Sequence, residues 1–421
     1  MIASFLQYLM EIPLRFRRVT RSHSYVPQID GMRFLAIMPV LFWHSCIRAA
    51  KTHPEISVTE AVYWLPHGHA GVELFFFISG YIIAYPFLAG RPPAIRAFYS
   101  RRVLRLEPPY FLAMTLAYLV LAITGYKPAA GEALSYRGDI SLFHSLLASL
   151  GYVHWLVFGS PSTINPPTWS LEVEIQFYLL SPLLLWAYGK MQSFRLRAPM
   201  LLLVALALMA ASGYLDALHG RYALHRWTLL GHAAPFLVGI VICDFAVCHD
   251  PFSAKPKPWF DLAFCGGIIL WLATAMFWLD ERADFGIGMG RDAARLTGIA
   301  AIYFGGAYGV FARRFLGLPW ISFIGGMCYS IYLIHVMVMQ GVYVGLGRIL
   351  PHLGLGTSFL VWFMLLAPTS ICAGTVYYLF VERACMNPDW PKLLLRKSGF
   401  GGRALIQGEK SGSAPSQRID M

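Results

Sequence analysis

Long runs of apolar residues, separated by short polar stretches, follow one another along most of the chain. A helix needs about 20 mostly apolar residues to cross the hydrocarbon core of a bilayer, which is about 30 Å thick. The pattern therefore predicts an all-α polytopic membrane protein, a bundle of about ten transmembrane helices. The expected spans are residues 33–50, 72–89, 107–124, 169–188, 199–216, 228–248, 260–279, 296–312, 320–346 and 358–381.

A further apolar run, residues 140–158, contains His144 and His154 and has no basic flank. Cytoplasmic loops of membrane proteins carry an excess of Lys and Arg. Lys and Arg concentrate in alternate loops of this chain if residues 140–158 do not span, and the bias largely cancels if they do. We therefore expect this run to be re-entrant or to lie on the outer surface, with both chain termini in the cytoplasm.

The two ends of the chain differ from the apolar middle. Residues 1–28 mix apolar residues with several Arg and lack a small-residue cleavage site, which indicates a cytoplasmic, interfacial amphipathic helix and not a secretory signal. Residues 386–421 are basic and rich in Gly and Ser, which is typical of a disordered cytoplasmic tail. Residues 29–385 then form the transmembrane domain.

Composition agrees with a membrane protein, since 57% of the 421 residues are hydrophobic and only 13% are charged. Soluble domains are about one quarter charged. The net charge of +12 would suggest nucleic acid as the partner of a soluble chain, but basic cytoplasmic loops and anionic lipids explain it here. We expect membrane lipids and no nucleic acid as partners. The seven Cys residues show no zinc-ligand spacing, so we expect no disulfide and no metal.

Two polar side chains, Arg33 and His44, enter the first apolar run eleven residues apart. Eleven residues make about three helical turns, so both lie on one face and are separated by about 16 Å along the axis. If Arg33 lies at one membrane surface, His44 lies near the middle of the hydrocarbon core. An ionisable residue at that depth is a functional candidate. The alternative is a histidine that only hydrogen-bonds a neighbouring helix.

Two glutamates are candidates for the acid–base partner of His44. Glu73 lies less than one turn inside the outer end of the second span, and Glu174 lies inside the fourth. A carboxylate on one imidazole nitrogen fixes the tautomer and makes the other nitrogen a better base. The alternatives are a solvated interfacial glutamate at position 73 and helix-dipole compensation at position 174.

Arg101, Arg102 and Arg105 form a basic cluster on the expected cytoplasmic side, and Arg102 and Arg105 share a helix face. Guanidinium groups suit phosphate oxygens. The cluster therefore indicates a phosphate-bearing ligand, and the alternative is a positive-inside anchor on lipid phosphates.

Further polar residues line up around these candidates. Tyr329, Tyr332 and His335 follow at three-residue steps and form one stripe, while Ser170 and Tyr178 lie four residues before and after Glu174. The stripe could belong to the site or could join helices.

Five motifs make the chain resemble the acyltransferase 3 family of integral membrane O-acyltransferases. They are I-D-G-M-R-F-L-A with His44 eleven residues after Arg33, G-V-E-L-F-F-F-I-S-G-Y, F-Y-S-R-R-V-L-R-L-E-P-P-Y, T-W-S-L-E-V-E-I-Q-F-Y and C-Y-S-I-Y-L-I-H. The family's W-S-L-x-x-E motif falls on residues 169–174 and adds Trp169 to the candidates. Position 73 is Glu where Asp is commoner, and Glu382-Arg383-Ala384 lacks the Pro of the family's E-x-P motif.

The resemblance implies an enzyme of the bacterial inner membrane that takes an acyl group, most commonly acetyl, from cytoplasmic acyl-CoA. The acceptor would be a hydroxyl of an extracytoplasmic or lipid-linked glycan, and glycan-assembly proteins are expected as further partners. In this interpretation Arg33, Arg101, Arg102 and Arg105 bind acyl-CoA. His44 is the general base or the acyl carrier, and Glu73 or Glu174 orients it.

Two other classes of function remain open on the sequence alone. In a proton-coupled transporter of a glycan or small metabolite, His44, Glu73, Glu174 and His335 would form a proton relay. An assembly scaffold for glycan export would need no acid–base pair.

Overall fold

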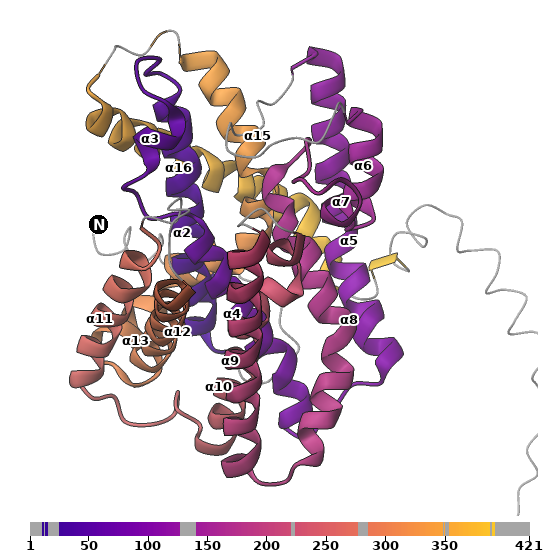
Figure 1. Cartoon of the computed structure of the whole chain (residues 1–421), viewed down its shortest axis with the longest axis vertical. Helices are drawn as coiled ribbons and strands as arrows, with labels where there is room; N and C mark the ends of the chain where they lie inside the picture. Colours follow the sequence, from indigo (N-terminus) through magenta and orange to yellow (C-terminus); the bar gives the residue numbers. More distant parts are fainter. Residues whose placement is uncertain are drawn as a thin grey trace, which may run out of the picture.

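A computed structural model of the chain describes residues 11, 13–15, 25–126, 140–219, 224–276, 285–347, 349, 353–387 and 390–391. Every regular element in these ranges is a helix, and the helices pack into one elongated bundle (Figure 1). The expected interfacial helix at 1–28 and the expected tail at 386–421 lie mostly outside the described residues.

The bundle contains ten helices of 15 or more residues, counted among the described elements. They are α2 (Pro27–Ala50), α4 (His69–Leu88), α5 (Ile95–Thr124), α8 (Trp169–Lys190), α9 (Phe194–His219), α10 (Leu229–His249), α11 (Trp259–Ala273), α12 (Phe285–Tyr308), α15 (Cys328–Leu346) and, as a tenth, α16 (Leu355–Tyr377).

The last of these helices, α16, runs on without a break through a π-helical turn, η3 (Tyr378–Glu382), into α17 (Arg383–Cys385). The short elements connect the long ones. They are α3 (Val58–Val62), α6 (Leu142–Leu150), α7 (His154–Phe158), η1 (Pro166–Thr168), η2 (Leu224–Trp227), α13 (Phe311–Leu316) and α14 (Pro319–Gly326).

Six of the long helices are long and apolar enough to cross a membrane, and these are α4, α5, α9, α10, α15 and α16 with its continuation. The other expected spans fall on α2, α8, α11 and α12. Charged residues lower the hydropathy of three of them, for example Arg33 in α2, Glu174 in α8 and Arg295 in α12, and α11 is only 15 residues long. The count of ten spans and the side of each terminus therefore stay predictions.

Two expected segments are divided differently in the structure. The span expected at 320–346 is broken at Met327 into α14 and α15. Residues 140–158 form the two short helices α6 and α7, and neither is long enough to cross a bilayer. Where this segment lies relative to the membrane stays a prediction.

Helix α2 lies against more neighbours than a peripheral helix would, because α4, α14, α15 and α16 all pack on it (Figure 1). Its buried residues include Met32, Ile37 and Leu41. Gly71 of α4 permits the close approach, since a Cβ atom at that position would lie 2.1 Å from the Ala36 carbonyl oxygen. His44 is therefore held on a helix that is fixed on several sides.

Helices α4 and α10 form an equally close pair. A Cβ atom at Gly80 would lie 2.1 Å from the Phe236 carbonyl oxygen, and one at Gly239 would lie 2.2 Å from that of Phe77. Glycine is thus required on both helices, so that the two backbones touch directly. This contact sets the positions of the side chains at the first turns of α4 and α10.

Candidate functional site

His44 meets another histidine across the interface between α2 and α15. The rings of His44 and His335 lie 5.0 Å apart between centroids, with an angle of 60° between their planes. His44 is half-buried, whereas His335 is fully buried. Two residues that the sequence separates by nearly 300 positions therefore come together.

The tautomer of His335 follows from its hydrogen bonds. Its Nδ1–H donates to the Tyr332 carbonyl oxygen at 2.7 Å, so Nε2 carries the lone pair. That Nε2 atom is buried and has no hydrogen-bond partner among the described residues. A buried acceptor without a donor is costly, so this atom is suited to accept a hydrogen bond from His44 or from a bound hydroxyl group.

The carboxylate expected beside His44 is not there. Glu73 pairs with His69 and Arg295, while Glu174 accepts hydrogen bonds from Ser79 and Tyr178. No hydrogen bond or ion pair joins either glutamate to His44 within the described parts of the chain. The expectation was wrong because helical spacing fixes the depth of a side chain but not the neighbour that it faces.

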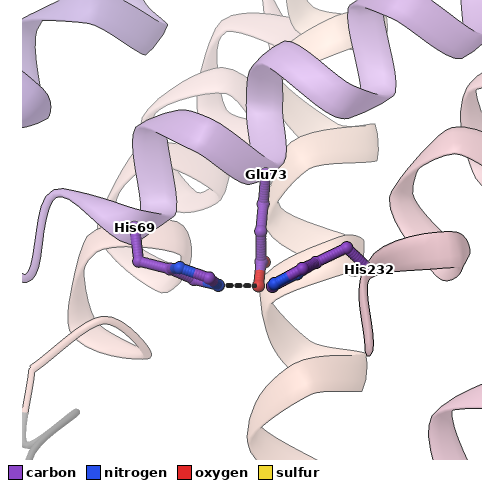
Figure 2. Close-up of side chains that lie close together, drawn as sticks. All are labelled: His69, Glu73 and His232. Atoms are coloured by element: carbon purple, nitrogen blue, oxygen red, sulfur yellow. Dashed lines mark ion pairs between the residues drawn. The ribbon is translucent and has the colours of Figure 1, made fainter. Parts of the chain in front are cut away.

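Glu73 belongs instead to a second cluster at the first turns of α4 and α10 (Figure 2). His69 Nε2 lies 3.1 Å from Glu73 Oε1, and the His232 ring approaches the same carboxylate from the other side. One nitrogen or oxygen atom of each of these three residues lies within 4.8 Å of the others. All three side chains are buried, and His232 Nε2 has no hydrogen-bond partner within the described ranges.

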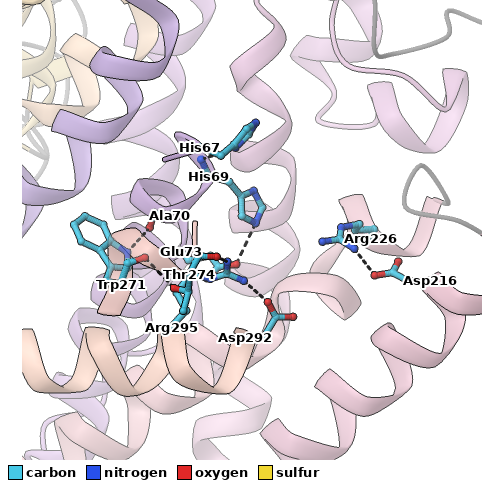
Figure 3. A network of polar contacts seen from close by, with 10 residues as sticks. All are labelled: His67, His69, Ala70, Glu73, Asp216, Arg226, Trp271, Thr274, Asp292 and Arg295. Atoms are coloured by element: carbon cyan, nitrogen blue, oxygen red, sulfur yellow. Dashed lines mark hydrogen bonds and ion pairs between the residues drawn. The ribbon is translucent and has the colours of Figure 1, made fainter. Parts of the chain in front are cut away.

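Arg295 of α12 fixes the far side of the Glu73 carboxylate (Figure 3). Its Nε–H donates to Glu73 Oε2 at 2.5 Å, and its other terminal groups bond to Asp292 and to the Thr274 carbonyl oxygen. Arg295 falls between the expected spans 260–279 and 296–312, but its side chain is buried in the bundle. A buried guanidinium needs such partners to offset the loss of hydration.

Trp169 joins this second cluster and not the His44 centre. Its indole stacks on the His69 ring at 5.5 Å with an angle of 11°, and it lies 5.2 Å from the His232 ring. Trp227 meets the same indole edge-on at 5.0 Å. Aromatic rings thus wall the cluster of His69, Glu73 and His232.

Glu174 forms a separate polar group with Tyr178 and Arg102. The Ser79 hydroxyl donates to Glu174 at 2.6 Å, and the Tyr178 hydroxyl donates to the same carboxylate oxygen. The Arg102 guanidinium lies over the Phe98 ring at 3.8 Å and near the Tyr178 ring at 5.2 Å. The Phe98 and Tyr178 rings, near the Glu174 carboxylate, therefore fix the orientation of the Arg102 guanidinium.

The other three candidate arginines have different surroundings. Arg33 donates to Asp30 at 2.7 Å within α2. Arg105 lies 4.0 Å from Glu382, a fully buried carboxylate that accepts from the Ser330 hydroxyl at 2.6 Å. Arg101 is exposed and donates to a carbonyl of its own helix. The four arginines thus do not form one cluster of equivalent groups.

The tyrosine stripe of α15 connects helices. The Tyr332 hydroxyl donates to the Pro167 carbonyl oxygen at 2.6 Å and lies 2.6 Å from Ser170 Oγ, which ties α15 to the start of α8. The Tyr329 hydroxyl donates to the Leu106 carbonyl oxygen at 2.9 Å, which ties α15 to α5. These bonds hold the helix that presents His335.

His154, in the segment 140–158, has a structural role. It is fully buried, donates from Nδ1 to the Ser160 carbonyl oxygen at 2.8 Å, and lies 3.0 Å from the Ser145 hydroxyl. Burial lowers the pKa of His154 below its ordinary value, so the ring is neutral at pH 7. Its bonds close the turn between α6 and α7.

The sequence interpretation missed His69, His232 and Arg295. One signal was visible, because His69 and Glu73 are four residues apart on one helix and therefore share a face. His232 gave no local signal, since His69 and Glu73 are more than 150 residues away in the chain. Arg295 has a local partner in Asp292, but nothing local indicates its pairing with Glu73, 222 residues away.

Comparison with known proteins identifies the family. The family description "Acyltransferase domain" of the acyltransferase 3 type matches residues 26–379, which is most of the chain. The chain belongs to the acyltransferase 3 family. The His44 centre, the cluster around Glu73 and the Glu174 group all lie within the matched residues. No solved structure matches the chain.

Among the similar proteins is the peptidoglycan O-acetyltransferase OatA of Listeria monocytogenes, 29% identical over 183 residues, which cover 41% of this chain and 26% of that protein. The O-acetyltransferase OatA of Staphylococcus aureus is 24% identical over 416 residues, which cover 94% of this chain and 62% of that protein. The chain therefore spans less than two thirds of the length of either relative.

Proposed function

We propose that this acyltransferase 3 chain moves an acyl group, in the first place acetyl, from cytoplasmic acyl-CoA to a hydroxyl of an extracytoplasmic or lipid-linked glycan. The observation that carries the proposal is the His44–His335 pair, which presents a basic nitrogen inside the helical bundle without a protein donor. The relatives named as O-acetyltransferases support the transferred group, and the peptidoglycan enzyme supports a glycan acceptor. The enzyme would work in the bacterial inner membrane.

In the proposed reaction His44 acts as the base. Its lone pair takes the proton of the acceptor hydroxyl while the oxygen attacks the thioester carbonyl, and the C–S bond then breaks. The departing thiolate receives the proton from His44, so that the products are the acylated glycan and free CoA. His335 positions the ring by accepting its second N–H at Nε2.

A covalent route through an acyl group on His44 needs the same two residues. In that route the acyl group passes first to the imidazole nitrogen, with release of CoA, and then to the glycan hydroxyl. The two routes differ in kinetics, because CoA release precedes acceptor binding only in the covalent one.

For the donor, we propose that Arg101 and Arg102 bind CoA phosphates at the inner end of the bundle. Arg102 is oriented by Tyr178 and the Glu174 carboxylate, and Arg101 is exposed beside it. Arg33 and Arg105, each close to a carboxylate, would take part by exchanging that partner for a phosphate oxygen.

The decisive experiment measures CoA release by the purified full chain with acetyl-CoA and bacterial cell-wall glycan, together with acetyl content of the glycan. We expect His44→Ala to lower turnover by about 10²–10⁴-fold, the usual contribution of a general base. His144→Ala, which alters an exposed histidine, is the control and is expected to keep wild-type turnover.

Normal acetyl transfer by a folded His44→Ala variant would refute the proposed role of His44. Uptake of acceptor into vesicles without any CoA release would instead favour a transporter.

A further inference from the structure

The cluster of His69, Glu73 and His232 has no part in the reaction proposed above. We propose that these three residues bind a divalent transition-metal ion of the zinc class. The expectation of no metal rested on the cysteine spacing, and this site contains no cysteine.

The ligand set is suited to zinc. Two imidazole nitrogens and one carboxylate oxygen make three protein ligands, which leaves a fourth position for water or another small ligand. His69 and Glu73 share a face of α4 because they are four residues apart, and His232 supplies the third ligand from α10 (Figure 2). The distance of 3.1 Å between His69 Nε2 and Glu73 Oε1 is close to that between two ligand atoms on one tetrahedral ion, about 3.3 Å at bond lengths near 2.0 Å.

An independent observation points to a ligand in the same place. His232 is only 4% exposed, and its Nε2 atom has no hydrogen-bond partner among the described residues. The ring approaches the Glu73 carboxylate, and its ligand atom lies within 4.8 Å of those of His69 and Glu73. A bound ion would supply the missing partner of this buried nitrogen.

The charges around Glu73 permit a dication. Arg295 bonds to Glu73 Oε2 and leaves Oε1 on the side of the two histidines. Asp292 bonds to the same guanidinium, so the group Glu73–Arg295–Asp292 has a net charge of −1 (Figure 3). Arg226, farther along the same network, is paired with Asp216. These paired groups together have the charge of a lone carboxylate between two neutral histidines, with Arg291 of α12 as a further cation near His69. Zinc binding would release the Nε2 proton of His69.

The experiment uses the full chain, purified in detergent with an affinity tag that contains no histidine, stripped with a chelator and dialysed against a small excess of Zn²⁺. We expect about one zinc ion per chain by elemental analysis, and visible absorption bands of four-coordinate cobalt when Co²⁺ replaces zinc. His232→Gln is expected to lose the bound metal and the cobalt bands. His249→Gln changes an exposed histidine at the opposite end of α10 and is expected to keep both.

Equal zinc content in wild type and folded His232→Gln would overturn the proposal, as would wild-type protein that holds no zinc after loading. The second result would mean that Arg295 is the only cation on Glu73. If His232→Gln aggregates, His69→Gln takes its place, and the cobalt spectrum of wild type still tests for nitrogen ligands. None of these measurements depends on acyl transfer, so the site and the proposed function fail or stand separately.

Discussion

The His44–His335 pair and the His69–His232 pair have nearly the same separation, 5.0 and 4.9 Å between ring centroids, but different surroundings. His44 and His335 have no carboxylate bonded to them within the described residues. Between His69 and His232 lies Glu73 (Figure 2), which bonds to Arg295, and Arg295 in turn bonds to Asp292. The first pair is therefore suited to the substrate of the proposed reaction, whereas the second is suited to the proposed metal ion.

The largest expected effect concerns the stability of the second pair. Arg295→Leu removes the partner of a buried carboxylate, which costs about 3–5 kcal/mol of unfolding free energy for a buried ion pair. Thermal unfolding of the detergent-purified protein measures the loss. Arg226→Leu, in the partly exposed pair with Asp216, is the control and is expected to cost about 1 kcal/mol or less.

If both variants lose the same stability, the contrast between a buried and a partly exposed ion pair is wrong. Combining Arg295→Leu with Glu73→Gln should recover part of the loss, because no unpaired charge then remains in the bundle.

The next effect distinguishes a catalytic role of the His44–His335 pair from a role in helix packing. In His335→Asn the side-chain amide can still donate to the Tyr332 carbonyl oxygen, but no atom replaces Nε2. We expect kcat to fall about tenfold or more, the scale of one hydrogen bond to a charged group, with an unchanged KM for acyl-CoA. Steady-state kinetics of CoA release measure both constants.

A kcat within about twofold of wild type would show that His335 only joins helices, since the bond to Tyr332 is kept in this variant.

The smallest expected effect tests whether Arg102, which belongs to neither histidine pair, binds the acyl-CoA donor. Arg102→Glu reverses the charge beside Tyr178, and we expect the KM for acyl-CoA to rise about tenfold because a charge-assisted phosphate contact is lost. The KM for the glycan should stay unchanged. Lys190→Glu, an exposed charge reversal at the end of α8, is the control for general electrostatic effects.

If Lys190→Glu raises the KM for acyl-CoA as much as Arg102→Glu does, the arginine contributes only to the overall charge of that surface.

The helical class of the fold could be predicted from the sequence, because it depends on local pattern, whereas the depth of His44 in the membrane stays a prediction. Apolar runs predict helices, and a spacing of eleven residues places Arg33 and His44 on one face whatever the neighbours are. The same pattern does not determine which helix faces that side. His335 was predicted as a residue of the site, but its contact with His44 was not.

The prediction that Glu73 contacts His44 was wrong for a clear physical reason. The sequence places Glu73 less than one turn inside the outer end of its span and His44 about 10 Å below the outer end of the first span, so contact was expected if the two helices packed side by side. Helix α4, however, turns Glu73 toward α10 and α12, where Arg295 lies 222 residues away in the chain. An ion pair over such a separation leaves no periodicity to detect, and Arg295 looked like one more loop cation.

The direct backbone contact of α4 with α10, at Gly80 and Gly239, has a consequence for substrate passage. We expect two helices that touch without intervening side chains to move together, since parting them would open a void along their length. A route for the proposed substrates, acyl-CoA and glycan, would then open elsewhere. We expect the interruption at Met327, which separates α14 from the helix that presents His335, to be the more easily deformed place.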